Sequence, residues 1–193
     1  MRGLVVAALL LLGSCRPVVV QMPVQEDAGV AAGLQHTMLM TEGCTAVDIG
    51  RGLVLTAAHC VDQHSPGNDT SVGMLVYQSR SRDFAVLFDT ARLANPSVKL
   101  RAPNKYERVY AVGYPVQLGS RLQELTVTDG LIAGPVDDEG CYRFTAPIYY
   151  GNSGGGVWAT DGALVGLSVS GYLELPAMNY LVSAADIAPW LPR

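Results

Sequence analysis

Gly151-Asn152-Ser153-Gly154-Gly155-Gly156 places one serine among four glycines, and the fold and function of this chain can be inferred outward from it. Glycine reaches backbone angles that other residues avoid, so such a turn can aim two backbone N–H groups at one point. The same turn can expose the serine hydroxyl. These are the requirements of a serine nucleophile with an oxyanion hole. The alternative is a glycine-rich turn that contains a serine by chance.

The histidines indicate which base would serve this serine, because a hydroxyl is a weak nucleophile without one. The chain has three, His36, His59 and His64, and all precede Ser153. His59 follows the apolar run Leu53-Val54-Leu55, which predicts a buried strand. An α/β-hydrolase needs its histidine after the serine, so the sequence excludes that class. His36 and His64 are interpreted as loop or surface residues.

Asp83 is the candidate for the acid that orients the histidine ring. It begins the apolar run Asp83-Phe84-Ala85-Val86-Leu87, where a solvated strand end is the structural alternative. The resulting order, His59, Asp83 and Ser153, matches the chymotrypsin order and differs from the aspartate-first order of subtilisin. Asp62 and Asp89 are the other acids that could fill this role.

Three motifs in this order resemble the trypsin-like (chymotrypsin-fold) serine peptidases: residues 56–60 (TAAHC), 83–87 (DFAVL) and 151–156 (GNSGGG). The residues of these motifs are most similar to those of the bacterial HtrA-like and glutamyl-endopeptidase-like branches. The resemblance extends from Leu34 to Trp190 and implies two packed antiparallel barrels with a C-terminal helix. The interval between His59 and Asp83 is short for the family, which implies trimmed loops.

The pattern of short apolar runs and turns predicts an all-β barrel or sandwich. The resemblance implies the more specific fold of two packed antiparallel, six-stranded-type β-barrels with a short C-terminal helix. Only the tail, Ser183 to Leu191, is predicted to be helical, with Ser183 as its N-cap. The expected strands are residues 35–40, 45–49, 53–56, 73–77, 84–88, 108–112, 122–128, 142–146, 156–159, 164–169 and 179–182.

The N-terminus has the features of an export signal, followed by a linker. Arg2 precedes an apolar run at residues 4–12 that is too short to span a bilayer. The small residues that end at Cys15 resemble a bacterial lipobox, and ordinary secretory cleavage nearby is the alternative. We therefore expect a signal with possible lipidation at 1–15, a linker at 16–33 and a peptidase domain at 34–193. The protein would be an exported cell-envelope lipoprotein or a secreted or periplasmic protein.

Charge and cysteine content exclude some functions. A net charge of −4 without a basic cluster argues against nucleic-acid binding, and no cofactor is expected. The resemblance implies a Cys44–Cys60 disulfide, which leaves Cys141 outside that bridge. The spacing of Cys44, His59, Cys60 and His64 matches no established zinc pattern, so no metal is expected.

The resemblance also implies where substrate contacts lie. Gly151 and Ser153 would supply the oxyanion-hole N–H groups, and Pro147 would lie at the base of the first specificity pocket. Its facing wall would include Ser168 and Ser170. An uncharged pocket predicts a small or apolar residue before the cleaved bond, because a buried cation would lack a partner. A glutamate preference is the alternative, with the two serines as donors.

Asn152 bears on activation. In trypsin-type zymogens, a new N-terminal ammonium pairs with an aspartate beside the nucleophile, and the asparagine here has no charge to offer. We therefore expect Asn152 side-chain hydrogen bonds to order the turn, with no need for N-terminal trimming inside the domain.

These observations together predict a serine endopeptidase that acts on peptide or protein substrates through an acyl-enzyme. An inactive peptidase-fold binding module and a structural lipoprotein are the alternatives. Membrane attachment through lipidated Cys15 is expected if the lipobox is used.

Overall fold

The computed structural model describes residues 27–41, 43–116, 123–136, 141–172 and 175–192. The predicted signal, Cys15 and most of the predicted linker lie outside these ranges. The elements described are α1 (Ala28–His36), β1 (Thr37–Leu39), β2 (Thr45–Gly50), β3 (Leu53–Thr56), β4 (Asp69–Thr70), β5 (Gly73–Ser79), β6 (Phe84–Phe88), β7 (Arg108–Gly113), β8 (Thr126–Pro135), β9 (Cys141–Phe144), β10 (Gly156–Ala159), β11 (Leu164–Tyr172), β12 (Leu175–Ser183) and α2 (Ala184–Ile187).

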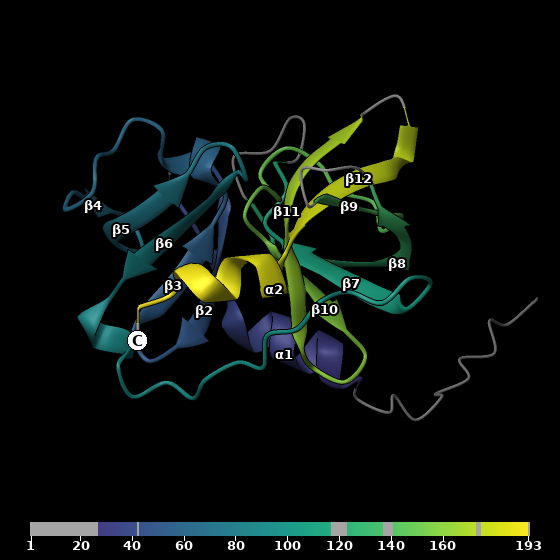
Figure 1. Ribbon diagram of the computed structural model, residues 1–193, viewed down its shortest axis with the longest axis horizontal. Helices are drawn as coiled ribbons and strands as arrows, with labels where there is room; N and C mark the ends of the chain where they lie inside the picture. Colours follow the sequence, from purple (N-terminus) through teal and green to yellow (C-terminus); the bar gives the residue numbers. More distant parts are fainter. Residues whose placement is uncertain (1–26, 42, 117–122, 137–140, 173–174, 193) are drawn as a thin grey trace, which may run out of the picture.

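The strands form two antiparallel sheets that lie side by side (Figure 1). The first is a six-stranded half-barrel in the order β1-β2-β3-β6-β5-β4, and the second is a closed barrel in the order β10-β11-β12-β9-β8-β7. The predicted all-β fold class is therefore confirmed, with the difference that only the second sheet closes. The predicted strands at 53–56, 84–88 and 156–159 have the predicted bounds.

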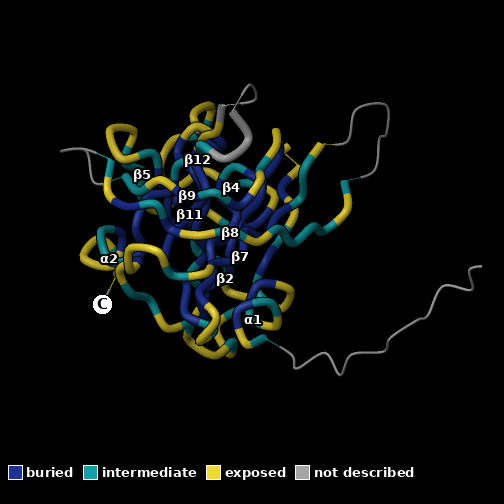
Figure 2. The backbone as a smooth tube through the Cα atoms, turned by 90° about the vertical axis from the view of Figure 1, so that its right-hand side faces the viewer, coloured by how far each residue is buried: buried dark blue, intermediate teal, exposed yellow. Residues whose placement is uncertain are grey.

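Alternate side chains along β7 pack into two different hydrophobic clusters. Val109 and Ala111 face the cluster inside the closed barrel, whereas Tyr110 and Val112 belong to the larger cluster shared with the first sheet. Successive side chains of a strand point to opposite faces, so one barrel wall can fill its own interior and the interface together. Figure 2 shows the resulting buried interior beneath exposed loops.

The helix α1 was not expected, since residues 28–33 were assigned to the linker. Asp27 caps it by accepting a hydrogen bond from Gly29 N at 2.9 Å, and also accepts one from the Tyr110 hydroxyl at 2.7 Å. A Cβ atom at Gly29 would lie 2.3 Å from Ala159 O, so the glycine permits close packing on the barrel. Residues 28–33 of the expected linker therefore belong to a helix, because small residues let this segment approach β7 and β10.

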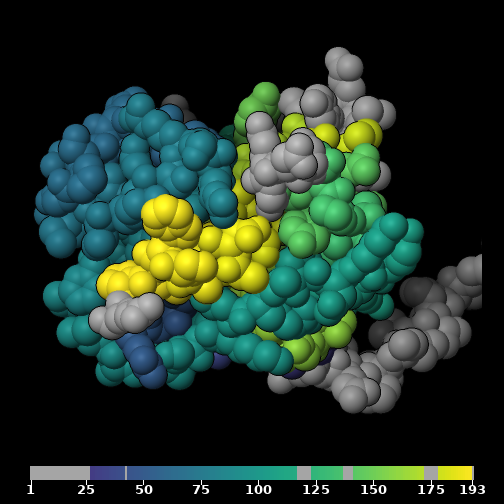
Figure 3. All heavy atoms as spheres, in the orientation of Figure 1, coloured from purple at the N-terminus to yellow at the C-terminus, as the bar shows by residue number. Residues whose placement is uncertain are grey.

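The C-terminal helix was predicted correctly. Ser183 accepts a hydrogen bond from Ala185 N at 3.2 Å, and α2 continues into a short 3-10 helix, Ala188–Trp190. The Trp190 ring stacks on Tyr77 of β5 at 5.2 Å. The C-terminal residues therefore lie across the junction between the two halves (Figure 3). Within the described ranges, no helix combines the length and the apolar character needed to cross a bilayer.

Candidate active site

His59 lies on a one-turn 3-10 helix, Ala58–Val61, directly after β3. Asp83 lies directly before β6, which pairs with β3, so the two residues meet at one end of adjacent strands. The ring Nδ1 of His59 is 2.8 Å from Asp83 Oδ2 and 3.1 Å from Oδ1. The backbone N–H of His59 also donates to Asp83 Oδ1 at 3.0 Å. This geometry fixes the ring and leaves Nε2 for a reactant.

Asp83 adopts an uncommon backbone conformation, with φ of 50°. Aspartate tolerates this left-handed region better than most residues. The conformation turns the carboxylate back onto His59, although the strand continues away from it. Sparsely populated backbone angles of this kind concentrate at functional sites.

The other two acids lie in different surroundings. Asp62 pairs with Arg80, at 3.2 Å from Oδ1 to Nε. Asp89 caps the turn Thr90–Arg92 and pairs with Arg92 at 3.0 Å. Neither carboxylate makes a hydrogen bond to the His59 ring, so the structure brings only Asp83 into orienting contact.

The pKa of His59 is raised from its usual value of 6.5. The largest cause of the raised pKa is the hydrogen bond to Asp83. Burial lowers the pKa, and the negative charges of Asp83 and Asp62 raise it further. His59 therefore accepts a proton more readily than a free imidazole does, which suits a general base.

Ser153 lies at the centre of a tight turn with glycines in left-handed conformations at Gly151, φ 92°, and Gly154, φ 81°. A Cβ atom at Gly154 would lie 2.2 Å from Thr56 Oγ1, so only glycine fits there. The turn is held by hydrogen bonds from Asn152 N to Tyr149 O at 3.0 Å and from Gly155 N to Asn152 O at 2.8 Å.

Two backbone donors of this turn remain available. Among the described residues, neither Gly151 N–H nor Ser153 N–H donates to a protein acceptor. Both were predicted to bind the oxyanion, and a donor that is already paired would not serve that role. Their hydrogen-bonding state therefore fits an open oxyanion hole.

Thr45 is a buried residue at the start of β2 that sequence reasoning did not identify. Its Oγ1 donates to Gly151 O at 2.7 Å and accepts from Tyr114 N at 2.9 Å. Its backbone N–H donates to Ser153 O at 2.9 Å. The first sheet thus holds the serine turn of the second, through a contact across 106 positions of sequence. No local pattern could have indicated it.

Asn152 does not act as predicted. Its side chain is buried, and Oδ1 has no hydrogen-bond partner among the described residues. Contrary to the expectation, no hydrogen bond from the Asn152 side chain to a described residue orders the turn. Its backbone oxygen instead accepts from Ser168 Oγ at 2.6 Å, and Gly154 N donates to Ser168 O at 2.7 Å. Thr45 and Ser168 do the ordering, because their side chains reach the turn from neighbouring strands.

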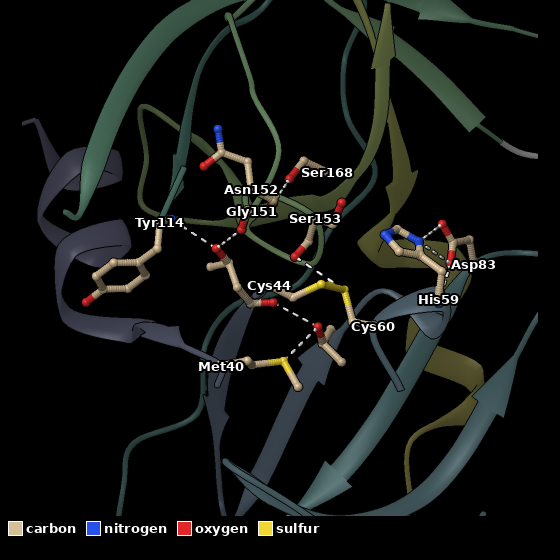
Figure 4. Close-up of a disulfide and its surroundings, with 12 residues drawn as sticks. Met40, Cys44, His59, Cys60, Asp83, Tyr114, Gly151, Asn152, Ser153 and Ser168 are labelled. Atoms are coloured by element: carbon tan, nitrogen blue, oxygen red, sulfur yellow. Dashed lines mark hydrogen bonds and ion pairs between the residues drawn. A yellow bond between two sulfur atoms is a disulfide. The ribbon is translucent and has the colours of Figure 1, made fainter. Parts of the chain in front are cut away.

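His59 and Ser153 line one cavity of about 350 Å³. The His59 side chain is 43% exposed, so a ligand can reach the ring. No hydrogen bond joins the ring to the Ser153 hydroxyl. Figure 4 shows the imidazole between Asp83 and Ser153, with Nδ1 on the aspartate. Hydrogen bonds between catalytic groups are often long before substrate binds.

The predicted pocket residues lie in different places. Ser170 lines the cavity, Ser168 is buried with its hydroxyl directed at the turn, and Pro147 is exposed outside the lining. Besides His59 and Ser153, the lining consists of uncharged residues, Ile148, Tyr149, Tyr150, Val169, Ser170 and Gly171.

The Cys44–Cys60 disulfide, which the resemblance implied, is present, and its residues are 16 positions apart. A loop of this size contributes about 3 kcal/mol to stability, mainly by restricting the unfolded chain. Cys60 Sγ lies 3.8 Å from Ser153 O, a packing contact, since a disulfide sulfur has no hydrogen to donate. Cys141 is not in a disulfide and is partly buried.

Comparison with known families gives one match over most of the chain. Residues 44–167 match the model described as a trypsin-like peptidase domain. No curated protein matches significantly.

Solved structures with this fold include several bacterial proteases. Rv3671c from M. tuberculosis H37Rv, in an inactive form, matches with a TM-score of 0.65 and 20% identity, over 85% of this chain and 88% of that one. The HtrA-type protease AlgW with tripeptide matches with a TM-score of 0.66 and 21% identity, over 84% of this chain and 62% of that one. A serine endoprotease from Yersinia pestis matches with a TM-score of 0.61 and 26% identity, over 76% of this chain and 55% of that one. The chain thus spans about three-fifths of the AlgW chain and about half of the Yersinia chain.

Proposed function

The chain belongs to the trypsin-like peptidase family, related to the HtrA-type proteases, and we propose that it is a serine endopeptidase with the triad His59, Asp83 and Ser153. The observation that carries this proposal is the Asp83-oriented imidazole in the same cavity as Ser153. The nucleophile, the base and its orienting acid come from three separate segments. A structural barrel would have no need to assemble them.

The reaction proceeds by acyl transfer. Ser153 Oγ attacks the substrate carbonyl while His59 Nε2 takes the hydroxyl proton. Asp83 accepts the hydrogen bond from Nδ1–H and stabilises the imidazolium that forms. The backbone N–H groups of Gly151 and Ser153 bind the oxyanion, and each such donor is worth roughly 10²–10³ in rate.

The second half of the reaction reuses the same groups. His59 returns its proton to the leaving amine, and the first product departs. A water molecule then gives a proton to His59 and attacks the acyl-enzyme ester. Collapse of that second tetrahedral species releases the new carboxylate and restores the Ser153 hydroxyl.

The competing hypothesis is a peptide-binding module with an unused triad. The missing hydrogen bond between His59 and Ser153 favours it. A fluorophosphonate probe separates the two, because it reacts only with an activated serine. We expect covalent labelling of the full chain, no labelling of Ser153→Ala or His59→Ala, and normal labelling of Ser65→Ala as a surface-serine control. A correctly folded chain that takes no label supports the binding module.

For specificity, we infer a preference for small or apolar residues before the cleaved bond. The cavity wall opposite Ser153 carries no charged side chain, and a buried Lys or Arg without a partner would cost several kcal/mol. The glutamate alternative is weakened because Ser168 Oγ already donates to Asn152 O, which leaves Ser170 as the only hydroxyl of the two on the wall. A peptide library dominated by Lys or Arg would contradict the inference.

We also infer activity without N-terminal trimming inside the domain. Asn152 offers no carboxylate to a new ammonium, and burying an unpaired ammonium is costly. The turn is already held by Thr45 and Ser168. A chain that starts before Arg16 should hydrolyse peptides as fast as one that starts at Arg16. Activity that appears only after cleavage near Val18 or Val30 contradicts this inference.

We propose export to the cell envelope, with Cys15 as the site of lipidation. The support is the pattern of the first 15 residues, a short apolar run with small residues before the cysteine. Metabolic labelling with an alkyne fatty acid in a bacterial host tests it. Label in the parent chain and none in Cys15→Ser supports lipidation, and label in neither supports ordinary secretory cleavage.

A further inference from the structure

One cluster beside the catalytic base has the composition of a soft-metal site. Cys44 Sγ, Cys60 Sγ and a ring nitrogen of His59 all lie within 4.8 Å of one another. In the disulfide, the sulfurs are neither charged nor strong donors, since the thiolate is the metal ligand. The oxidised protein therefore offers one ligand here, and the reduced protein offers three.

We propose that reduction of Cys44–Cys60 creates a Zn²⁺ site whose third ligand is His59 Nε2, so that the metal blocks the general base. The disulfide takes up two electrons and two protons to give two thiols. A phosphine supplies the electrons and, with water, becomes the phosphine oxide. Zinc then displaces the two thiol protons and binds two thiolates, together with the Nε2 lone pair that catalysis would use.

The distances suit this ligand set. Zinc–sulfur bonds of about 2.3 Å and zinc–nitrogen bonds of about 2.0 Å place tetrahedral ligand atoms roughly 3.5–3.8 Å apart. The two sulfurs and a ring nitrogen of His59 already lie within 4.8 Å of one another, and the two cysteine Cα atoms are 6.1 Å apart. Small side-chain rotations are therefore enough to form the site, and no strand has to move.

Hydrogen bonds that do not involve sulfur hold the two cysteines in place. Met40 N donates to Cys44 O at 2.9 Å, and the next residue, Thr45, donates from its N–H to Ser153 O at 2.9 Å. Cys60 N donates to Ala57 O at 3.2 Å. We therefore expect the local backbone to persist when the disulfide opens.

Asp83 preorganises the third ligand. Its carboxylate binds Nδ1 at 2.8 Å, so the lone pair of the neutral ring is on Nε2. A carboxylate that accepts from the far nitrogen is the usual outer partner of a zinc-bound histidine. The arrangement that prepares His59 to accept a proton prepares it equally to bind a metal.

The site is also accessible. A cavity of about 350 Å³ is lined by both cysteines and His59, with Asp62, Gln63 and His64 completing its wall. A metal ion can enter from solvent and keep a water molecule as its fourth ligand. The negative charge of Asp62 favours a cation there. Figure 4 shows the disulfide between the serine turn and His59.

Cobalt(II) gives a test that does not depend on peptidase activity. In the full chain carrying Cys15→Ser and Cys141→Ser, the only remaining thiols are Cys44 and Cys60. After phosphine reduction and desalting, we expect one equivalent of Co²⁺ to give thiolate charge-transfer and tetrahedral ligand-field bands, which zinc removes. The oxidised protein should give neither. His59→Ala should weaken Co²⁺ binding by about tenfold or more, whereas His36→Ala should not.

The functional arm measures peptide hydrolysis. Zinc should inhibit the reduced protein by about tenfold or more, a chelator should reverse this, and the oxidised protein should be unaffected at the same zinc concentration. The proposal is overturned by absent cobalt–thiolate bands, by unchanged affinity in His59→Ala, by zinc binding that leaves hydrolysis intact, or by loss of near-UV circular dichroism on reduction. A chain that fails to label with fluorophosphonate yet shows the His59-dependent cobalt site refutes the peptidase proposal alone.

Discussion

The two halves of the molecule build their parts of the site in different ways. In the first sheet, His59 and Asp83 lie at the ends of the paired strands β3 and β6, and the hydrogen bonds between them join residues of this sheet alone. In the second, the Ser153 turn depends on Thr45 of the first sheet as well as on Ser168 of β11. The acid–base pair is thus a local product of one sheet, whereas the nucleophile's turn is a product of the interface.

This difference predicts how the site fails. Damage to the acid–base pair should reduce the chemical step and leave the turn unchanged. Damage to the interface should reduce both catalysis and stability, because the turn and the packing of the two halves share the same hydrogen bonds.

The largest expected effect is that of Asp83→Asn within the first sheet. The amide would favour the wrong imidazole tautomer, so kcat should fall by about 10⁴-fold with little change in thermal unfolding. Steady-state kinetics and calorimetry measure the two quantities. Asp89→Asn is the matched control, because Asp89 pairs with Arg92 away from the ring. Near-normal hydrolysis by Asp83→Asn would transfer the orienting role to Asp62 or Asp89.

Thr45→Val tests the interface and ranks second. It leaves Gly151 O and Tyr114 N without the threonine hydroxyl. The unfolding free energy should fall by about 1–3 kcal/mol, and kcat by about 100-fold, since misplacement by about 1 Å has that cost. Thr37→Val is the control, because its buried Oγ1 has no partner among the described residues. Equal losses in both variants would show that the Thr45 hydroxyl has no special role.

A smaller effect is expected on the pH dependence of kcat/KM, which is governed by His59 of the first sheet. Catalysis needs neutral His59, and its pKa is raised above 6.5, so kcat/KM should be lost as pH falls through that raised value. Asp62→Asn removes one negative charge that raises the pKa of His59, so the acid limb should move to lower pH. Asp69→Asn, distant in β4, should leave the profile in place. An acid limb that moves upward in Asp62→Asn would contradict the electrostatic assignment.

The smallest effect belongs to the ion pairs at the β10–β11 turn. Burial tends to raise the pKa of Asp161, but hydrogen bonds from Ala163 N, Arg101 and Lys99 lower this pKa from 3.8 to about 2. The ionised carboxylate of Asp161 therefore stabilises the folded protein above pH 3.8, and this contribution is lost as pH falls to about 2. Because Asp161 is largely exposed, Asp161→Asn should cost only about 0.5 kcal/mol near neutral pH.

Denaturant unfolding of Asp161→Asn at several pH values measures this loss. The difference from the parent chain should shrink as pH falls below 3.8 and vanish near 2. A constant difference at all pH values would mean that packing, rather than charge, is responsible.

Local patterns explain why much of the fold was predictable. Apolar runs such as residues 53–56 and 84–88 are buried strands, because their side chains fill a core whichever strands they pair with. Ser183 predicted the start of α2, since an N-cap acts within three residues. The helix at residues 28–36 also follows an N-cap, Asp27, but residues 28–33 show no clean helical period. Their helix forms through packing on β7 and β10, and their own sequence does not contain that information.

The sequence by itself determined the candidate nucleophile Ser153 with its glycine turn, the candidate base His59 and the all-β class, because each rests on residue chemistry or short-range geometry. Only the tertiary structure decided that Asp83 rather than Asp62 or Asp89 meets the ring, and that Thr45 rather than Asn152 holds the turn. It also decided that Ser168 is directed away from the cavity. These outcomes depend on which distant strands become neighbours, as with Thr45 and Gly151 across 106 positions. Such contacts are set by the pairing and twist of whole sheets, and no periodicity within either segment encodes them.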